Sequence, residues 1–98
     1  KLVYTGDTGM RHDLVDIVSG ADMLLADVCY LNEELKGKLM AAHLSAGQAG
    51  NLAAAANADM LLCTHLFGGR KEHNELLSQA RQAFPKAALA EEYKTYPI

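Results

Sequence analysis

LVYTGDTG, residues 2–9, is a short run of apolar, β-branched and aromatic side chains that stops at an aspartate between two glycines. The run predicts a buried strand that ends in a sharp turn. The glycines let the backbone turn tightly, so the carboxylate of Asp7 can project from the carboxyl end of the strand without crowding. Asp7 is therefore a candidate metal ligand or catalytic acid, and the competing interpretation is that it only caps its own turn.

Strand and helix patterns alternate downstream of this turn. Apolar residues recur at helical spacing over residues 12–19, and Gly20 stands where a helix commonly ends. Residues 23–26 and 60–64 are unbroken apolar runs, which predict strands covered on both faces. The polar residues 31–42 predict a surface loop.

A longer helix is predicted to begin at Ser45, because Ser45 and Gln48 have the spacing of a capping box. It continues through an alanine-rich segment to about Asn57, and its small side chains suit close packing against a sheet. A third helix is predicted over residues 71–84, and a last strand over residues 87–90. This order of elements is typical of an α/β layer.

Length and composition allow one core and no more. The chain has 98 residues, half of them hydrophobic, so we expect a single domain over residues 1–98. No apolar run is long enough to cross a membrane. The formal charge is −3 and the basic residues are scattered, which excludes the basic footprint typical of nucleic-acid-binding domains.

Two further features bear on the origin of the chain. Lys1 is followed at once by a strand, without an initiator methionine or a targeting segment, so we expect a fragment whose beginning is missing. Cys29 and Cys63 form no CxxC pair and are too few for a disulfide scaffold. The expected location is therefore the cytoplasm.

Asp7, Asp27 and His65 all stand at the ends of predicted strands. Because the carboxyl ends of parallel strands meet at one edge of a sheet, these residues lie where such sheets hold their ligands. Carboxylate oxygen and imidazole nitrogen are both accepted ligands of a zinc-like ion. A catalytic zinc usually takes three protein ligands, so this chain supplies at most part of a site.

The other histidines and the cysteine differ in their surroundings. His43 directly precedes a capped helix start, where the positive end of the helix dipole favours an anionic group nearby. His12 and His73 stand in polar surroundings and are expected to be solvated. Cys63 lies in an apolar strand and is expected to belong to the core.

Three segments together resemble the C-terminal half of a metallo-β-lactamase-fold hydrolase of the ribonuclease Z-like kind. They are VYTGDT at residues 3–8, HLSAGQAG at residues 43–50 and LLCTHL at residues 61–66. The resemblance implies an α/β fold that forms the C-terminal half of a four-layer αββα sandwich. It also implies two divalent metal ions at the sheet edges, with zinc favoured and manganese or iron left open.

The resemblance also implies roles for single residues. Asp7 is similar to the carboxylate that bridges the two ions, and His65 to the last histidine ligand of the second ion. His43 resembles the histidine that stabilises or protonates the leaving oxygen, which makes it the candidate catalytic residue. Asp27 falls where many relatives carry a glutamate, and it is a secondary candidate.

The family's His-x-His-x-Asp-His cluster, which supplies most ligands, is absent from these residues. The resemblance therefore implies a partner half, the missing N-terminal half of the same protein, and leaves a homodimer open. The implied function is metal-dependent hydrolysis of a phosphodiester or a small-molecule ester by a metal-activated water, with no membrane partner.

Two alternatives stay open. One is a non-catalytic α/β interaction domain with a vestigial site, which the absence of the histidine cluster supports. The other keeps the metal fold and changes the bond to an ester, thioester or lactone, since the net acidity favours a small substrate over RNA.

Overall fold

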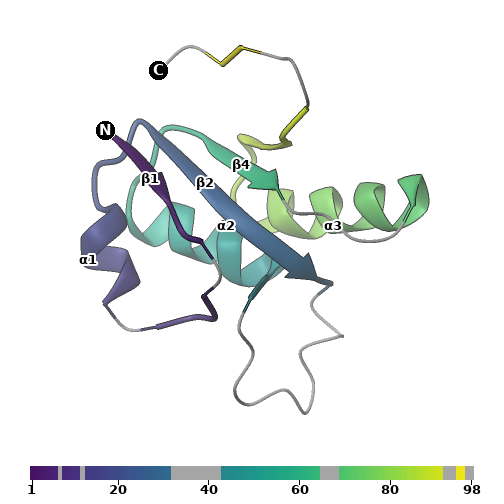
Figure 1. The fold of residues 1–98 in the computed structure, drawn as a ribbon, viewed down its shortest axis with the longest axis horizontal. Helices are drawn as coiled ribbons and strands as arrows, with labels where there is room; N and C mark the ends of the chain where they lie inside the picture. The colour runs from purple at the N-terminus through teal and green to yellow at the C-terminus, as the bar shows by residue number, and fades with distance from the viewer. Residues whose placement is uncertain (7, 12, 32–42, 65–68, 92–94, 97–98) are drawn as a thin grey trace.

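The computed structural model describes residues 1–6, 8–11, 13–31, 43–64, 69–91 and 95–96. Strands and helices alternate along most of the chain (Figure 1). In chain order the elements are β1 (Leu2–Tyr4), α1 (Leu14–Val18), β2 (Met23–Tyr30), β3 (Leu44–Ser45), α2 (Ala46–Ala55), β4 (Leu61–Thr64), α3 (Arg70–Ala83) and β5 (Ala87–Leu89). Within these residues no helix has both the length and the apolar character that a membrane span requires.

The strands form a parallel sheet in the order β1-β2-β4-β5, with β3 paired to the end of β2. The predicted α/β class is confirmed. Most elements lie within about two residues of the predicted bounds, and two elements differ more. β2 continues to Tyr30, beyond the apolar run that ends at Ala26, and β3 has only two residues, which is too short for any periodicity to reveal. The expected loop over residues 31–42 falls almost wholly outside the described residues.

The pentapeptide ADMLL occurs at residues 21–25 and again at residues 58–62. The two copies lie side by side in register, because β2 and β4 pair Leu24 with Leu61. Each copy follows a residue with a left-handed backbone that ends the preceding helix, Gly20 at φ 73° and Asn57 at φ 55°. The repeat therefore reflects two equivalent helix-to-strand connections.

The helices cover one face of the sheet. Alternate residues of a strand point to opposite faces. In β2, Leu24, Ala26 and Val28 belong to the core cluster that also contains the buried residues of the helices. Figure 1 shows β2 crossing in front of α2, which runs behind the sheet.

The other face of the sheet is apolar and open at β1. Leu2 and Tyr4 are 55% and 58% exposed on this face. Met23 and Leu62 lie further into the sheet on the same face and are buried. The described residues thus leave β1 with an uncovered apolar surface, as an isolated layer of a sandwich would.

Ser45 begins α2 with the predicted capping box. Its hydroxyl accepts the Gln48 backbone N–H at 3.1 Å, and the Gln48 side-chain oxygen accepts the Ser45 N–H at 3.1 Å. Two of the unpaired N–H groups at the helix start are thereby satisfied. The direction of α2 is fixed directly after β3.

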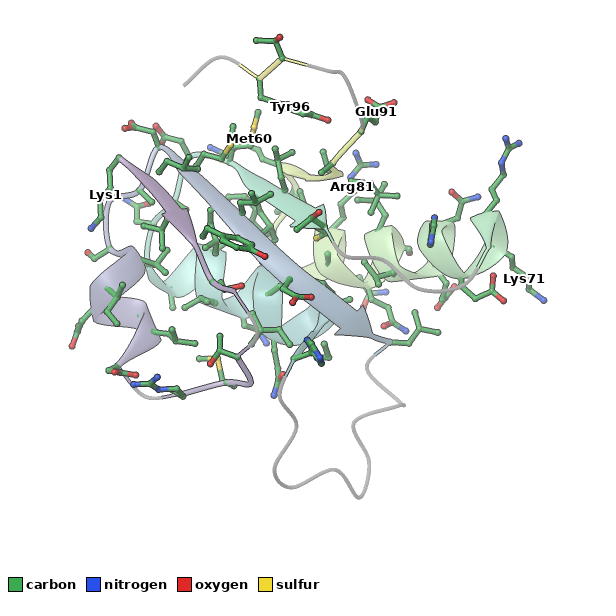
Figure 2. All side chains as sticks on the ribbon, viewed as in Figure 1. Lys1, Met60, Lys71, Arg81, Glu91 and Tyr96 are labelled. Atoms are coloured by element: carbon green, nitrogen blue, oxygen red, sulfur yellow. The ribbon has the colours of Figure 1, made fainter. Side chains whose placement is uncertain are left out.

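Two contacts hold the last third of the chain together. Arg81, labelled in Figure 2, donates a hydrogen bond from Nε to the backbone oxygen of Ala87, so the end of α3 is tied to β5. The Tyr96 hydroxyl accepts the Glu91 N–H at 3.0 Å and donates to the Leu89 oxygen, which folds the tail back on β5.

The Glu72 carboxylate stabilises the start of α3, where it accepts the Gly69 N–H at 2.9 Å. Hydrogen bonds from its own backbone N–H and from Gly69 lower the pKa of Glu72. The negative charge also lies at the positive end of the helix dipole. The predicted helix over residues 71–84 is confirmed, and it begins one residue earlier, at Arg70.

Cys63 lies in the core, as expected, and is fully buried. Burial raises the pKa of its thiol from 9.0 to about 12. At pH 8 the folded protein should alkylate at Cys63 at least about 100-fold more slowly than the denatured protein, because the thiolate is the nucleophile. Mass spectrometry of the peptide that contains Cys63 measures both rates.

The raised pKa of Cys63 also predicts how the free energy of unfolding changes with pH. The folded state keeps a proton that the unfolded state releases above pH 9.0, so the free energy of unfolding should fall as pH rises from 9.0 towards 12. Equal alkylation rates in the folded and denatured states would contradict the buried position of Cys63.

Candidate active site

The sequence-based candidates fall into two groups. Asp7 and His65, the candidate metal ligands, lie outside the described residues, as does His12. Asp27 and His43 are described, and the structure brings them together. The candidate site is therefore built from this pair and from the strand ends around it.

The register of β2 and β3 places Asp27 beside His43. Val28 pairs with Leu44 in a parallel arrangement. The residue before each of these, Asp27 on one side and His43 on the other, therefore comes next to its counterpart with its side chain on the same face. Val28 and Leu44 point into the core, so Asp27 and His43 lie on the face away from the helices.

The two side chains meet at ion-pair distance. His43 Nδ1 lies 3.3 Å from Asp27 Oδ2. The Asp27 side chain is 0% exposed, whereas the His43 side chain is 22% exposed. A buried carboxylate next to one ring nitrogen restricts the orientation of the imidazole. The more accessible part of the ring can still reach a ligand.

Thr5 joins the end of β1 to this pair. Its backbone N–H donates to the Leu25 oxygen at 3.1 Å, which continues the β1–β2 ladder by one residue. Its hydroxyl oxygen then accepts the Asp27 N–H at 3.0 Å. Gly6 follows with φ 63°, and the chain leaves the sheet there.

The start of α2 lies directly after the pair in sequence. His43 is followed by the two residues of β3, and Ser45 is at once the end of β3 and the N-cap of α2. The unpaired N–H groups and the dipole of a helix start favour negative charge nearby. An anionic group bound next to His43 would gain from both.

The ends of β1 and β4 flank β2 near Asp27, before β2 itself ends at Tyr30. Thr5 contacts Asp27 from the β1 side, and Thr64 pairs with Asp27 in the β2–β4 register. Among the described residues there is no group of three or more histidine, cysteine, aspartate or glutamate side chains that could hold a metal ion. The described part of the site is thus an acid–imidazole pair at the carboxyl edge of a parallel sheet.

One expectation about the histidines is wrong. His73 is half-buried, its Nε2 is shielded from solvent, and no described group hydrogen-bonds to that atom. The reason is its place on α3, since His73, Leu76, Leu77 and Ala80 recur at three- and four-residue spacing and share the inward face. This helical spacing indicates the inward position of His73, whereas its polar neighbours in the sequence indicated a solvated residue.

Sequence reasoning also missed the partnership of Asp27 with His43 and the contact from Thr5. The pairing depends on β3, which no pattern predicts. The sequence indicates the Thr5 contact only weakly. Thr5 directly precedes a Gly-Asp turn, where the backbone hydrogen bonds of the strand end and a hydroxyl can replace one of them.

No protein-family model matches the chain. The chain is 36% identical to ribonuclease Z of Bradyrhizobium diazoefficiens over 93 residues, which cover 95% of this chain and 31% of that protein. It is 31% identical to ribonuclease Z of Azobacteroides pseudotrichonymphae over 98 residues, covering 100% of this chain and 34% of that one. The matched part is C-terminal, and the chain spans about a third of the length of the curated relatives it matches.

A solved structure gives the same result for the fold. The metallo-β-lactamase fold protein YhfI from Bacillus subtilis superposes with a TM-score of 0.76 at 27% identity, covering 90% of this chain and 35% of that one. This likeness confirms the fold class that the sequence resemblance implies. The resemblance to ribonuclease Z is likewise confirmed.

Proposed function

The chain resembles a C-terminal segment of ribonuclease Z and has a metallo-β-lactamase fold, and on that premise we propose that it forms part of the active site of a metal-dependent hydrolase. The proposed reaction is hydrolysis of a phosphodiester. The curated relatives are named as ribonucleases, which favours this bond over an ester.

One observation carries the proposal. Asp27 and His43 are 3.3 Å apart at the carboxyl edge of the sheet, between the strand ends that lead to Asp7 and His65. A buried carboxylate against a partly exposed imidazole is an arrangement suited to proton transfer. A plain interaction domain has no need of it.

The proposal assigns Asp7 and His65 as metal ligands, with zinc as the expected ion. The described residues by themselves do not form a metal site. When bound, a divalent ion supplies a water of lowered pKa as the nucleophile. A tetrahedral site needs more ligands than these two residues offer.

His43 acts as the general acid in the proposed mechanism. The protonated ring donates a proton from Nε2 to the oxygen that leaves phosphorus as the bond breaks. The Asp27 carboxylate lies 3.3 Å from Nδ1 and in this proposal holds the ring with Nε2 towards the substrate. The start of α2 adds a favourable field for the phosphate oxygens.

The remaining ligands are assigned to an N-terminal half of the same protein, with residues 1–98 as one part of a shared domain. The open apolar surface at Leu2 and Tyr4 supports this assignment, since a second layer would cover it. The greater length of the relatives supports it too. We propose a cytoplasmic location, which suits the unpaired Cys63.

The proposal predicts that Asp7→Ala and His65→Ala lower metal content and phosphodiester turnover together. Loss of one ligand typically removes most of the affinity of a site with few ligands. Elemental analysis of the full-length wild type and of both variants measures the metal. Turnover of a bis-nitrophenyl phosphate and of a nitrophenyl acetate separates a phosphodiesterase from an esterase.

The matched control is Asp59→Ala, which removes an exposed aspartate at the opposite, amino-terminal edge of the sheet. It should leave the metal content unchanged. Normal metal stoichiometry in both the Asp7 and His65 variants would refute the ligand assignment. A wild-type protein without metal would favour an interaction domain.

A further inference from the structure

Thr5 uses its side chain where a strand would use its backbone. In a regular parallel ladder a residue donates its N–H to one neighbour and accepts the next N–H with its own carbonyl. Thr5 does the first normally, because its N–H donates to Leu25. The second partner, the Asp27 N–H, bonds instead to the Thr5 hydroxyl at 3.0 Å.

This exchange lets β1 end early without leaving β2 unpaired. The backbone at Gly6 turns away with φ 63°, so the Thr5 carbonyl is released from the ladder. The Thr5 hydroxyl hydrogen in turn donates to the Gly6 oxygen at 3.1 Å, which fixes the rotamer of the side chain. A buried N–H left without a partner would be costly, and the hydroxyl prevents that at Asp27.

We propose that Thr5 is a positioning residue that holds Asp27, and through it His43, in the geometry for proton transfer. The inference rests on the proposed function, because it concerns the same acid–imidazole pair. The Asp27 backbone is fixed by Thr5 on one side and by the β4 ladder on the other. The Asp27 carboxylate then meets His43 at 3.3 Å.

Two variants isolate the hydroxyl. Thr5→Val keeps the shape of the side chain and suits a strand, but it removes the acceptor. Thr5→Ser keeps the hydroxyl. In the full-length protein, we expect Thr5→Val to lower kcat on a dinucleotide phosphodiester at least about tenfold, with KM within about twofold, and Thr5→Ser to restore most of the rate.

A double variant distinguishes positioning from general damage. If Thr5 acts through His43, Thr5→Val should cost nothing further in a His43→Ala background. Metal content should stay at the wild-type value in Thr5→Val. The remote control is Thr95→Val, an exposed threonine whose replacement should leave kcat unchanged.

A measurement without substrate keeps the two proposals apart. Hydrogen exchange of the Asp27 amide should be at least about tenfold faster in Thr5→Val than in wild type or Thr5→Ser. Fast exchange with an unchanged kcat would overturn the positioning role, as would effects that multiply with His43→Ala or a loss of metal. A His43→Ala protein with wild-type turnover would instead refute the proposed function. The exchange rate of the Asp27 amide would still test the Thr5 contact.

Discussion

His43→Ala in the full-length protein should lower kcat on a dinucleotide phosphodiester by about 100-fold or more, while metal content stays unchanged. The ring is the partly exposed member of a pair whose other member, Asp27, is buried 3.3 Å away. Alanine removes the proton donor and leaves the strand ends intact. Steady-state kinetics with elemental analysis of the same samples measures both quantities.

The leaving group gives this prediction a sharper form. A nucleoside alkoxide is a poor leaving group and needs a proton as the bond breaks, whereas nitrophenolate leaves readily without one. The loss in His43→Ala should therefore be less than about tenfold on a bis-nitrophenyl phosphate. Equal losses on both substrates would point to a role in binding or folding instead.

His73→Ala is the matched control. It makes the same substitution at another half-buried imidazole, which lies on α3 and takes no part in the pair with Asp27. Its kcat on both substrates should stay within about twofold of wild type, as expected for a residue outside the machinery. An unchanged kcat in His43→Ala would refute the general-acid assignment.

Gly50→Leu should destabilise the fold by about 3 kcal/mol or more. Gly50 lies in α2 where the helix crosses α3. A Cβ atom at this position would stand 2.6 Å from the Ala80 oxygen and 2.9 Å from the Ala83 Cβ. The first of these is a backbone atom, so the helices must move apart to admit any side chain.

Gly50→Ala tests the same contact with a smaller group. Alanine gains about 1 kcal/mol in helix propensity over glycine. Overpacking of a fixed interface costs typically about 1–3 kcal/mol, so the loss should win. The fall in the urea midpoint of the full-length protein, at constant m-value, measures the effect.

Asn51→Ala is the control for this pair of variants. Asn51 is the next residue of α2 and is exposed. Because its side chain is exposed, alanine should raise the midpoint slightly through helix propensity. A Gly50→Ala protein as stable as Asn51→Ala would show that α3 yields easily at this crossing.

The sequence by itself determined the class of the fold and most of its elements. Unbroken apolar runs identified β2 and β4, because a strand covered on both faces has no solvent-exposed positions for alternating polar side chains. The Ser45 and Gln48 spacing located the start of α2, since capping is a local interaction between residues three positions apart. The buried position of Cys63 followed from the same local patterns.

The tertiary structure alone decided how the candidate site is assembled. Asp27 and His43 are separated by a segment whose sequence carries no period, and only the register of β3 on β2 makes them neighbours. The Thr5 contact with Asp27 likewise depends on where β1 leaves the sheet. Local patterns encode interactions within a few residues, whereas the meeting of strand ends is set by the packing of the whole layer.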